Sequence, residues 1–123
     1  MRRLQAILVC LFAVLPLAAA SETYLYMAEE HGCPWCARWD REVSEIYPKT
    51  PEGREAPLRR FDIHTGQPEH VLFERRVTFT PTFILVRDNV EISRIEGYPG
   101  EDFFWGLLGI MLEKARIQND EAG

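Results

Sequence analysis

The chain has 123 residues, which is enough for one domain, and carries a formal charge of −5. Its 14 Lys and Arg residues are outnumbered by 19 Asp and Glu residues, which argues against a nucleic-acid-binding surface. Aromatic and β-branched residues occur along the whole chain, so the composition also argues against intrinsic disorder. We expect a folded protein that has no nucleic-acid partner.

The first 20 residues have the pattern of a secretory signal peptide. Two arginines precede an apolar run from Leu4 to Leu17, and Ala18 to Ala20 supply the small residues that a signal peptidase requires. The apolar run is too short to span a bilayer comfortably. We expect residues 1–20 to be removed during export. Residues 21–123 then form one soluble domain of charge −7, because the signal holds two basic residues and no acidic ones.

The hydrophobic pattern predicts strands and helices in alternation. In chain order these are a strand at Thr23–Met27, a helix from Cys33 to Tyr47, a strand at Leu58–Ile63, a short helix at Pro68–Arg76, strands at Thr82–Val86 and Val90–Glu96, and a last helix from Glu101. Residues 48–57, rich in proline and charge, are predicted as a surface loop, and the tail from Gln118 as frayed.

This order predicts the fold class. A strand, a crossover helix and a second strand imply a parallel pair, and Asp88-Asn89 predicts a tight turn that closes an antiparallel hairpin. The nearly continuous apolar run from Thr82 to Val86 is typical of a central strand that is covered on both faces. We therefore expect an α/β fold with a mixed four-stranded sheet flanked by helices.

Two cysteines lie close together between the first strand and the first helix. Cys10 leaves with the signal, so only Cys33 and Cys36 remain, separated by Pro34 and Trp35. A cysteine at a helix N-terminus lies in partial positive charge, which stabilises the thiolate that acts in disulfide exchange. We assign Cys33 as the attacking thiol and Cys36, one turn further on, as the resolving thiol.

With these features the chain resembles the thioredoxin superfamily. The order of elements is that of the minimal thioredoxin fold, and the segment from Val77 to Thr82 is similar to the family's V-x-x-x-P-T segment. The resemblance implies a cis peptide before Pro81, a substrate strand that pairs with the backbone of Thr80, and no cofactor besides the redox-active disulfide. Trp35 and Pro34, between the cysteines, are expected to contact the substrate.

One family residue is missing from this sequence. At Met27, six residues before the first cysteine, thioredoxins often have a buried Asp that accepts the proton of the resolving thiol. The lysine sometimes found beside that Asp maps best onto Arg60, which does not act as a base. Glu29, Glu30 and water remain as candidate proton acceptors.

The resemblance also implies a direction for electron transfer. Strong periplasmic oxidases have a histidine between their cysteines, whereas this chain has the neutral Trp35, which favours a reductant. The H-G-C-P-W-C stretch, the T-P-T segment and the signal together resemble the periplasmic thioredoxins of bacterial sulfur-oxidation systems. This implies a monomer that reduces the cysteine of the sulfur carrier protein and receives electrons from a membrane thiol transporter.

Other functions remain open at this stage. A general or cytochrome-maturation periplasmic disulfide reductase would use the same pair of cysteines. Glutaredoxins share C-P-x-C but typically have a T-V-P segment and a Gly-Gly turn, which this sequence lacks. From a different class, a metal-binding protein would use Cys33, Cys36 and His31 as soft ligands for Cu(I) or Zn, although three candidate ligands are few for such a site.

Overall fold

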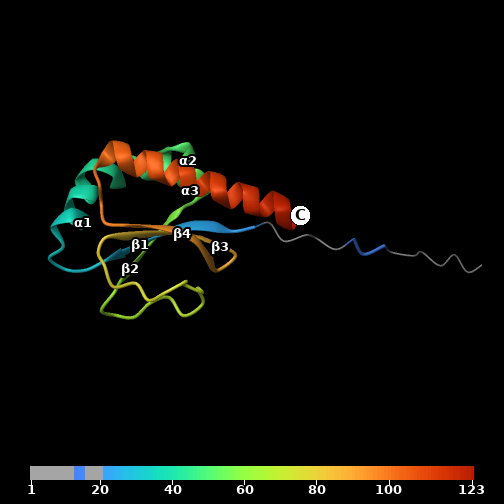
Figure 1. The fold of residues 1–123 in the computed structure, drawn as a ribbon, viewed down its shortest axis with the longest axis horizontal. Coiled ribbons are helices and arrows are strands. Elements are labelled where there is room, and N and C mark those ends of the chain that lie inside the picture. Colours follow the sequence, from blue (N-terminus) through green and yellow to red (C-terminus); the bar gives the residue numbers. More distant parts are fainter. Residues whose placement is uncertain (1–12, 16–20) are drawn as a thin grey trace, which may run out of the picture.

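The computed structural model describes residues 13–15 and 21–123 (Figure 1). Apart from residues 13–15, the predicted signal peptide therefore lies outside the described residues. The rest builds one sheet of four strands in the order β2-β1-β3-β4, in which β1 and β2 are parallel and the other two pairs are antiparallel. The strands are β1 (Thr23–Glu29), β2 (Leu58–Asp62), β3 (Thr82–Arg87) and β4 (Val90–Glu96). This is the mixed sheet that the sequence predicted.

The helices cover one face of this sheet. They are α1 (Pro34–Trp39), a π-helical turn (Asp40–Ser44), a 3-10 turn (Tyr47–Lys49), α2 (Pro51–Glu55) and the long α3 (Glu101–Ala122). Figure 1 shows α3 lying along the sheet with α1 and α2 on the same side, and the connection from β2 to β3 on the opposite side. In the part of the chain that the structure describes, no helix combines the length and apolar character needed to cross a membrane.

Each face of the sheet has its own apolar core. On the helix face, Trp39 is fully buried and its ring lies 5.2 Å from that of Phe83 and 5.7 Å from that of Phe104. On the opposite face, Ile84 and Val71 belong to a second buried cluster. Burial of each large apolar side chain contributes about 1.5–3 kcal/mol. Because β3 has a core on both faces, its apolar run is nearly continuous, as predicted.

The first predicted helix is interrupted where it was expected to continue. After Trp39 the chain widens into a π-helical turn, and a 3-10 turn follows at Tyr47. Trp39, Val43 and Tyr47 are all fully buried at spacings of four residues. In a regular α-helix each such step drifts by about 40° around the axis, and a wider turn compensates for this drift. The interruption therefore keeps all three side chains in the core.

The predicted surface loop at 48–57 is partly wrong, because it contains the short helix α2. The side chain of Thr50 caps this helix by accepting a hydrogen bond from Gly53 N–H over 3.0 Å. Gly53 is buried so close to the carbonyl of Tyr47 that a Cβ at this position would clash with it. Local capping and a close backbone contact thus order a segment whose composition indicated a loop.

The predicted helix at 68–76 is wrong. Residues 63–81, which the structure describes throughout, contain no helix. Instead Leu72 is extended beside β4: its N–H donates to Asn89 O over 2.7 Å and its carbonyl accepts from Glu91 N–H over 3.1 Å. Val71 is buried while Leu72 is 69% exposed, so burial follows the alternation of an extended chain. The apolar residues of this connection cover the second face of the sheet in place of a helix.

Of two further predictions, one is confirmed and one is wrong. The hairpin turn is as predicted, with positive φ at Asp88 (49°) and Asn89 (64°). The C-terminal tail, expected to be frayed from Gln118, remains helical to Ala122. The exposed last turns of α3 thus continue the helix beyond its buried stripe.

Candidate active site

Cys33 and Cys36 form a disulfide at the junction of β1 and α1. Their Cα atoms lie 5.3 Å apart. Cys33 is the N-cap of α1, with an extended backbone, and Pro34 occupies the first helical turn, where its missing N–H leaves no bond unmade. The backbone N–H of Cys36 donates to Cys33 Sγ over 3.2 Å. The sulfur of Cys33 therefore lies at the positive end of the helix.

The two cysteines differ in their access to solvent. Cys33 is half-buried, whereas Cys36 is only 6% exposed and packs with the core on the helix face. Pro34 is exposed, and Trp35 is 52% exposed with the guanidinium of Arg38 5.5 Å from its ring centroid. A partner can therefore approach Cys33 and the two residues between the cysteines, but not Cys36.

The Thr80–Pro81 segment contacts the loop that precedes this pair. The peptide bond between the two residues is cis, and Pro81 is buried. The hydroxyl of Thr80 donates to Glu30 Oε2 over 2.8 Å, and Glu30 lines the same pocket as Cys33. Contacts thus join the loop before the cysteines to the residue before the cis-proline, although the two are 50 positions apart.

An apolar groove of about 330 Å³ lies beside Trp35, one of the two residues between the cysteines. Trp35 lines it from α1, Phe79 from the segment before the cis-proline, and Leu107 from α3. Gly97, whose φ is +92°, lies in the groove 3.5 Å from Phe79, measured from the position a Cβ would take. Phe79 is 56% exposed, and nothing in the predicted elements had marked it as a surface residue of the site. The groove therefore joins the exposed Trp35 to apolar side chains of two other segments.

A second, acidic pocket of about 600 Å³ borders the disulfide itself. Carboxylates from several elements line it together with both cysteines: Glu29, Glu30, Asp40 and Asp62. Arg60 pairs with two of them, through Nη1 to Glu29 at 2.8 Å and through Nη2 to Asp40 at 2.7 Å. These partners raise the pKa of Arg60 against the opposing effect of its burial, so Arg60 is a fixed cation that partly neutralises the pocket.

The position of the missing acid is closed to solvent. Met27 is fully buried in the helix-face core, in the same cluster as Cys36. The acids that share a pocket with the pair, Glu29, Glu30, Asp40 and Asp62, line its surface instead. Asp40 was not among the candidates drawn from the sequence, although it follows Cys36 by four residues, a spacing that places both on one face of a helix.

The structure gives no support to a metal site. Within residues 13–15 and 21–123, no group of three or more His, Cys, Asp and Glu side chains could hold a metal ion. His31 is exposed at the rim of the acidic pocket. The two sulfurs that a soft metal would require are joined to each other.

Comparison with solved structures decides the family. The chain matches the crystal structure of the periplasmic thioredoxin SoxS from Paracoccus pantotrophus in its reduced form, with 49% sequence identity and a TM-score of 0.75. The match covers 76% of this chain and 99% of that chain. This chain belongs to the SoxS family of thioredoxins.

A more distant structure shares only the fold with this member of the SoxS family. Thioredoxin from Malassezia sympodialis matches with 14% identity and a TM-score of 0.52, over 73% of this chain and 75% of that chain. No protein-family model and no curated protein matches the chain. Membership of the SoxS family and the paired Cys33 and Cys36 make the chain a thiol-disulfide oxidoreductase.

Proposed function

We propose that this oxidoreductase is a periplasmic reductant in which Cys33 is the nucleophile and Cys36 the resolving thiol. The observation that carries the proposal is the difference between the two sulfurs: one is accessible at a helix N-terminus and the other is buried behind it. A partner disulfide can reach only the first, and an N-terminal helix position favours the thiolate that attacks it. The exchange therefore has a fixed order.

The proposed reaction transfers two electrons to the partner. The Cys33 thiolate attacks one sulfur of the partner disulfide, that S–S bond breaks, and one partner sulfur leaves as a thiolate. Cys36 then loses its proton and attacks Cys33 Sγ, which releases the second partner thiolate and forms the Cys33–Cys36 disulfide. The two released thiolates take up the protons that the two cysteines lost. Both sulfurs of the protein are oxidised, and both sulfurs of the partner are reduced.

Three residues around the pair are proposed to bind the partner, and the cis-proline Pro81 is proposed to belong to the catalytic set with the two cysteines. Trp35 and Pro34 present exposed surface between the cysteines, and the backbone of Thr80 is free to pair with an extended partner segment. Pro81 ends that segment. An extended strand bound to Thr80 would bring its own cysteine over Cys33, in the manner of strand addition at a sheet edge.

The proposed partner is the sulfur carrier protein of a sulfur-oxidation system, whose cysteine would be kept reduced. Support comes from the similarity to SoxS. Electrons would come from a membrane thiol transporter, because the periplasm keeps thiols oxidised. The protein would act as a monomer. A general periplasmic reductase, or one that serves cytochrome maturation, is the alternative with the same chemistry.

Trapping the partner tests this function. Cys36→Ser leaves Cys33 able to attack but removes the thiol that resolves the mixed disulfide, so the adduct should persist. In cells that oxidise reduced sulfur compounds, we expect one dominant, reductant-sensitive adduct with the sulfur carrier protein. The double variant Cys33→Ser, Cys36→Ser is the control and should give none. Similar yields of many unrelated disulfide proteins, without enrichment of the carrier, would indicate the general reductase.

The proposed location has its own test. Cleavage after Ala20 would leave a periplasmic protein that begins at Ser21. N-terminal sequencing of the protein recovered from the periplasmic fraction should therefore start at Ser21. Recovery in the cytoplasmic fraction with the first 20 residues retained would contradict the proposed location. It would not bear on the proposed thiol-disulfide exchange.

A further inference from the structure

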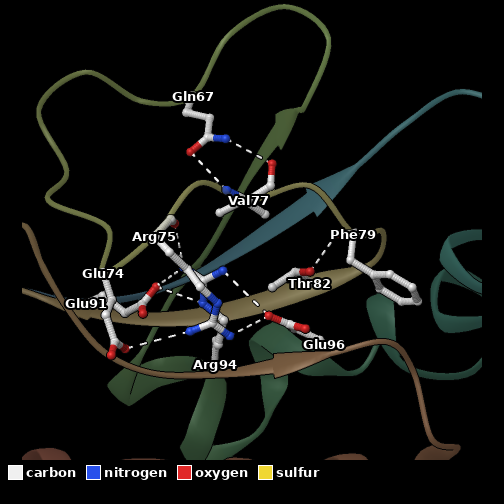
Figure 2. A network of polar contacts seen from close by, with 9 residues as sticks. All are labelled: Gln67, Glu74, Arg75, Val77, Phe79, Thr82, Glu91, Arg94 and Glu96. Atoms are coloured by element: carbon white, nitrogen blue, oxygen red, sulfur yellow. Dashed lines mark hydrogen bonds and ion pairs between the residues drawn. The ribbon is translucent and has the colours of Figure 1, made fainter.

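The segment that carries Thr80 has little regular structure of its own to hold it. Between Arg75 and Pro81 the described chain forms no helix or strand, and of the residues before Thr80 in this stretch only Val77 is buried. A helix was expected at residues 68–76. Because it does not form, the segment that follows is not held by the backbone hydrogen bonds of a helix. The segment is held instead by side chains that bond to its backbone (Figure 2).

Gln67 holds the middle of the segment. Its Nε2 donates to the carbonyl of Val77 over 2.9 Å, and its Oε1 accepts from the N–H of Val77 over 3.3 Å. Figure 2 shows both bonds running from the one amide group. The side chain thus satisfies both backbone groups of Val77, as a neighbouring strand would.

Arg94 holds the start of the segment from β4. Its Nη2 donates to the carbonyl of Arg75 over 2.9 Å, and the same guanidinium pairs with Glu91. The side chain of Arg94 is 6% exposed and that of Glu91 is 2% exposed. Burying two charges costs free energy that their attraction need not recover, so such a pair is weak evidence for stability alone. The buried pair instead fixes the Arg94 guanidinium in the position from which it donates to the carbonyl of Arg75.

A third contact holds the end of the segment. Thr82, the buried polar residue that follows the cis-proline, donates its hydroxyl to the carbonyl of Phe79 over 2.5 Å. Together the three side chains bond to the backbone at positions 75, 77 and 79. Thr80 comes directly after the last of these, and its hydroxyl bonds to Glu30. The backbone groups of Thr80 are thus presented by a segment fixed on both sides.

We propose that Gln67 and Arg94 are positioning residues for partner binding: they hold the Arg75–Pro81 segment so that the Thr80 backbone is ready to pair with an extended protein substrate. The proposal rests on the proposed function, in which Thr80 binds the partner. It separates two properties of the site. Binding of a protein partner depends on the segment, whereas the chemistry of Cys33 depends on α1, and the hydrogen bonds of Gln67 and Arg94 go to Val77, Arg75 and Glu91.

Steady-state kinetics with two oxidised substrates test this separation. Insulin serves as the protein disulfide and hydroxyethyl disulfide as a small one that has no extended chain. Gln67→Ala removes both bonds to Val77. We expect KM for insulin to rise about fivefold, as if one hydrogen bond between Thr80 and the insulin chain were lost, with kcat little changed. The rate with hydroxyethyl disulfide and the reduction potential should be unchanged. Gln118→Ala, on the exposed end of α3, is the matched control.

Arg94 is tested by a pair of variants, because its removal leaves Glu91 buried without its partner. Arg94→Met is expected to raise KM for insulin and also to lower the denaturation midpoint. Arg94→Lys keeps the charge but lacks the planar guanidinium that donates to Glu91 and Arg75 at the same time. It should therefore restore the denaturation midpoint more fully than it restores KM for insulin. Unchanged KM in folded variants of both residues, or an equal loss with hydroxyethyl disulfide, would overturn the positioning role.

Hydrogen exchange tells a failure of this role from a failure of the proposed function. The probe is a short synthetic peptide with one central cysteine, activated as its thionitrobenzoate disulfide and coupled to the Cys36→Ser protein. We expect the Thr80 amide to be protected in this adduct and less protected when Gln67→Ala is added. No protection in the first adduct would refute partner binding at Thr80. Equal protection in both would refute only the role of Gln67.

Discussion

The backbone N–H of Cys36 points at the sulfur of Cys33, 3.2 Å away. The contact arises because Cys33 is the N-cap of α1 and its side chain accepts from the third residue along, which is the geometry of an ordinary cap. A serine or aspartate in this position would serve the helix equally well. The residue is a cysteine, so the capping donor also faces the atom that carries the negative charge once the disulfide is reduced.

Alkylation of the reduced protein should label Cys33 far faster than Cys36. Thiols at helix N-termini ionise readily, and Cys36 is 6% exposed. Iodoacetamide at neutral pH, followed by mass spectrometry of the cysteine-containing peptides, measures the two rates. Cys36→Ser should leave the rate at Cys33 nearly unchanged. Equal rates at the two cysteines would remove the asymmetry on which the order of exchange depends.

The reduction potential should lie nearer to thioredoxin's, about −270 mV, than to that of a strong oxidase, about −120 mV. Trp35 carries no charge, and the carboxylates of the adjoining pocket oppose a thiolate. Trp35→His should raise the potential, because a cation between the cysteines stabilises the reduced form. Trp35→Phe is the matched control and should stay near the wild type. Equilibration with glutathione buffers measures the reduction potentials of the wild type and both variants. A wild-type potential near that of a strong oxidase would contradict the proposed role as a reductant.

Restoring the family's acid should destabilise this protein. Met27 is fully buried, so Met27→Asp places a carboxyl in an apolar core and raises the pKa of that group. We expect a loss of several kcal/mol in the free energy of unfolding at neutral pH. The loss should be smaller in acid, where the carboxyl is protonated in both states. Met27→Leu should cost less than about 1.5 kcal/mol, and urea denaturation at two pH values compares the variants.

Tyr47 should make the folded protein less stable at high pH. Its hydroxyl donates to the carbonyl of Ala56 over 2.6 Å, and burial, with smaller effects of Glu52 and Glu55, raises its pKa well above the usual 10.0. The unfolded chain therefore ionises first as the pH rises past 10. This part of the stability is complete below that pH and falls by about 1.4 kcal/mol per pH unit above it.

Tyr47→Phe isolates this effect. The variant leaves the Ala56 carbonyl without its donor, so it should lose about 1–3 kcal/mol at neutral pH. It should also have a shallower decline above pH 10 than the wild type. Tyr24→Phe, at a half-buried tyrosine of β1, is the control and should keep the wild-type slope. Identical slopes for Tyr47→Phe and the wild type in denaturant titrations would contradict this assignment.

The features that depend on local chemistry could be predicted from the amino-acid sequence. Three features can each be predicted from a stretch of a few residues. They are the paired cysteines around Pro34 and Trp35, the hairpin turn at Asp88 and Asn89, and the continuous apolar run of β3. Each follows from a short-range rule: a proline in the first helical turn, two residues that tolerate positive φ, a strand with a core on both faces. The resemblance in these short segments was sufficient to indicate the fold and the thiol chemistry.

How the remaining segments are held depends on contacts between residues that are far apart in the sequence. Residues 68–76 have helical spacing, yet they become extended, because pairing with β4 and burial of Val71 outweigh a weak local preference. The contacts of Gln67 with Val77 and of Arg94 with Arg75 join positions 10 and 19 residues apart, so no local sequence pattern predicts them. Side chains that bond to a distant backbone acquire their role only when the sheet brings the two together.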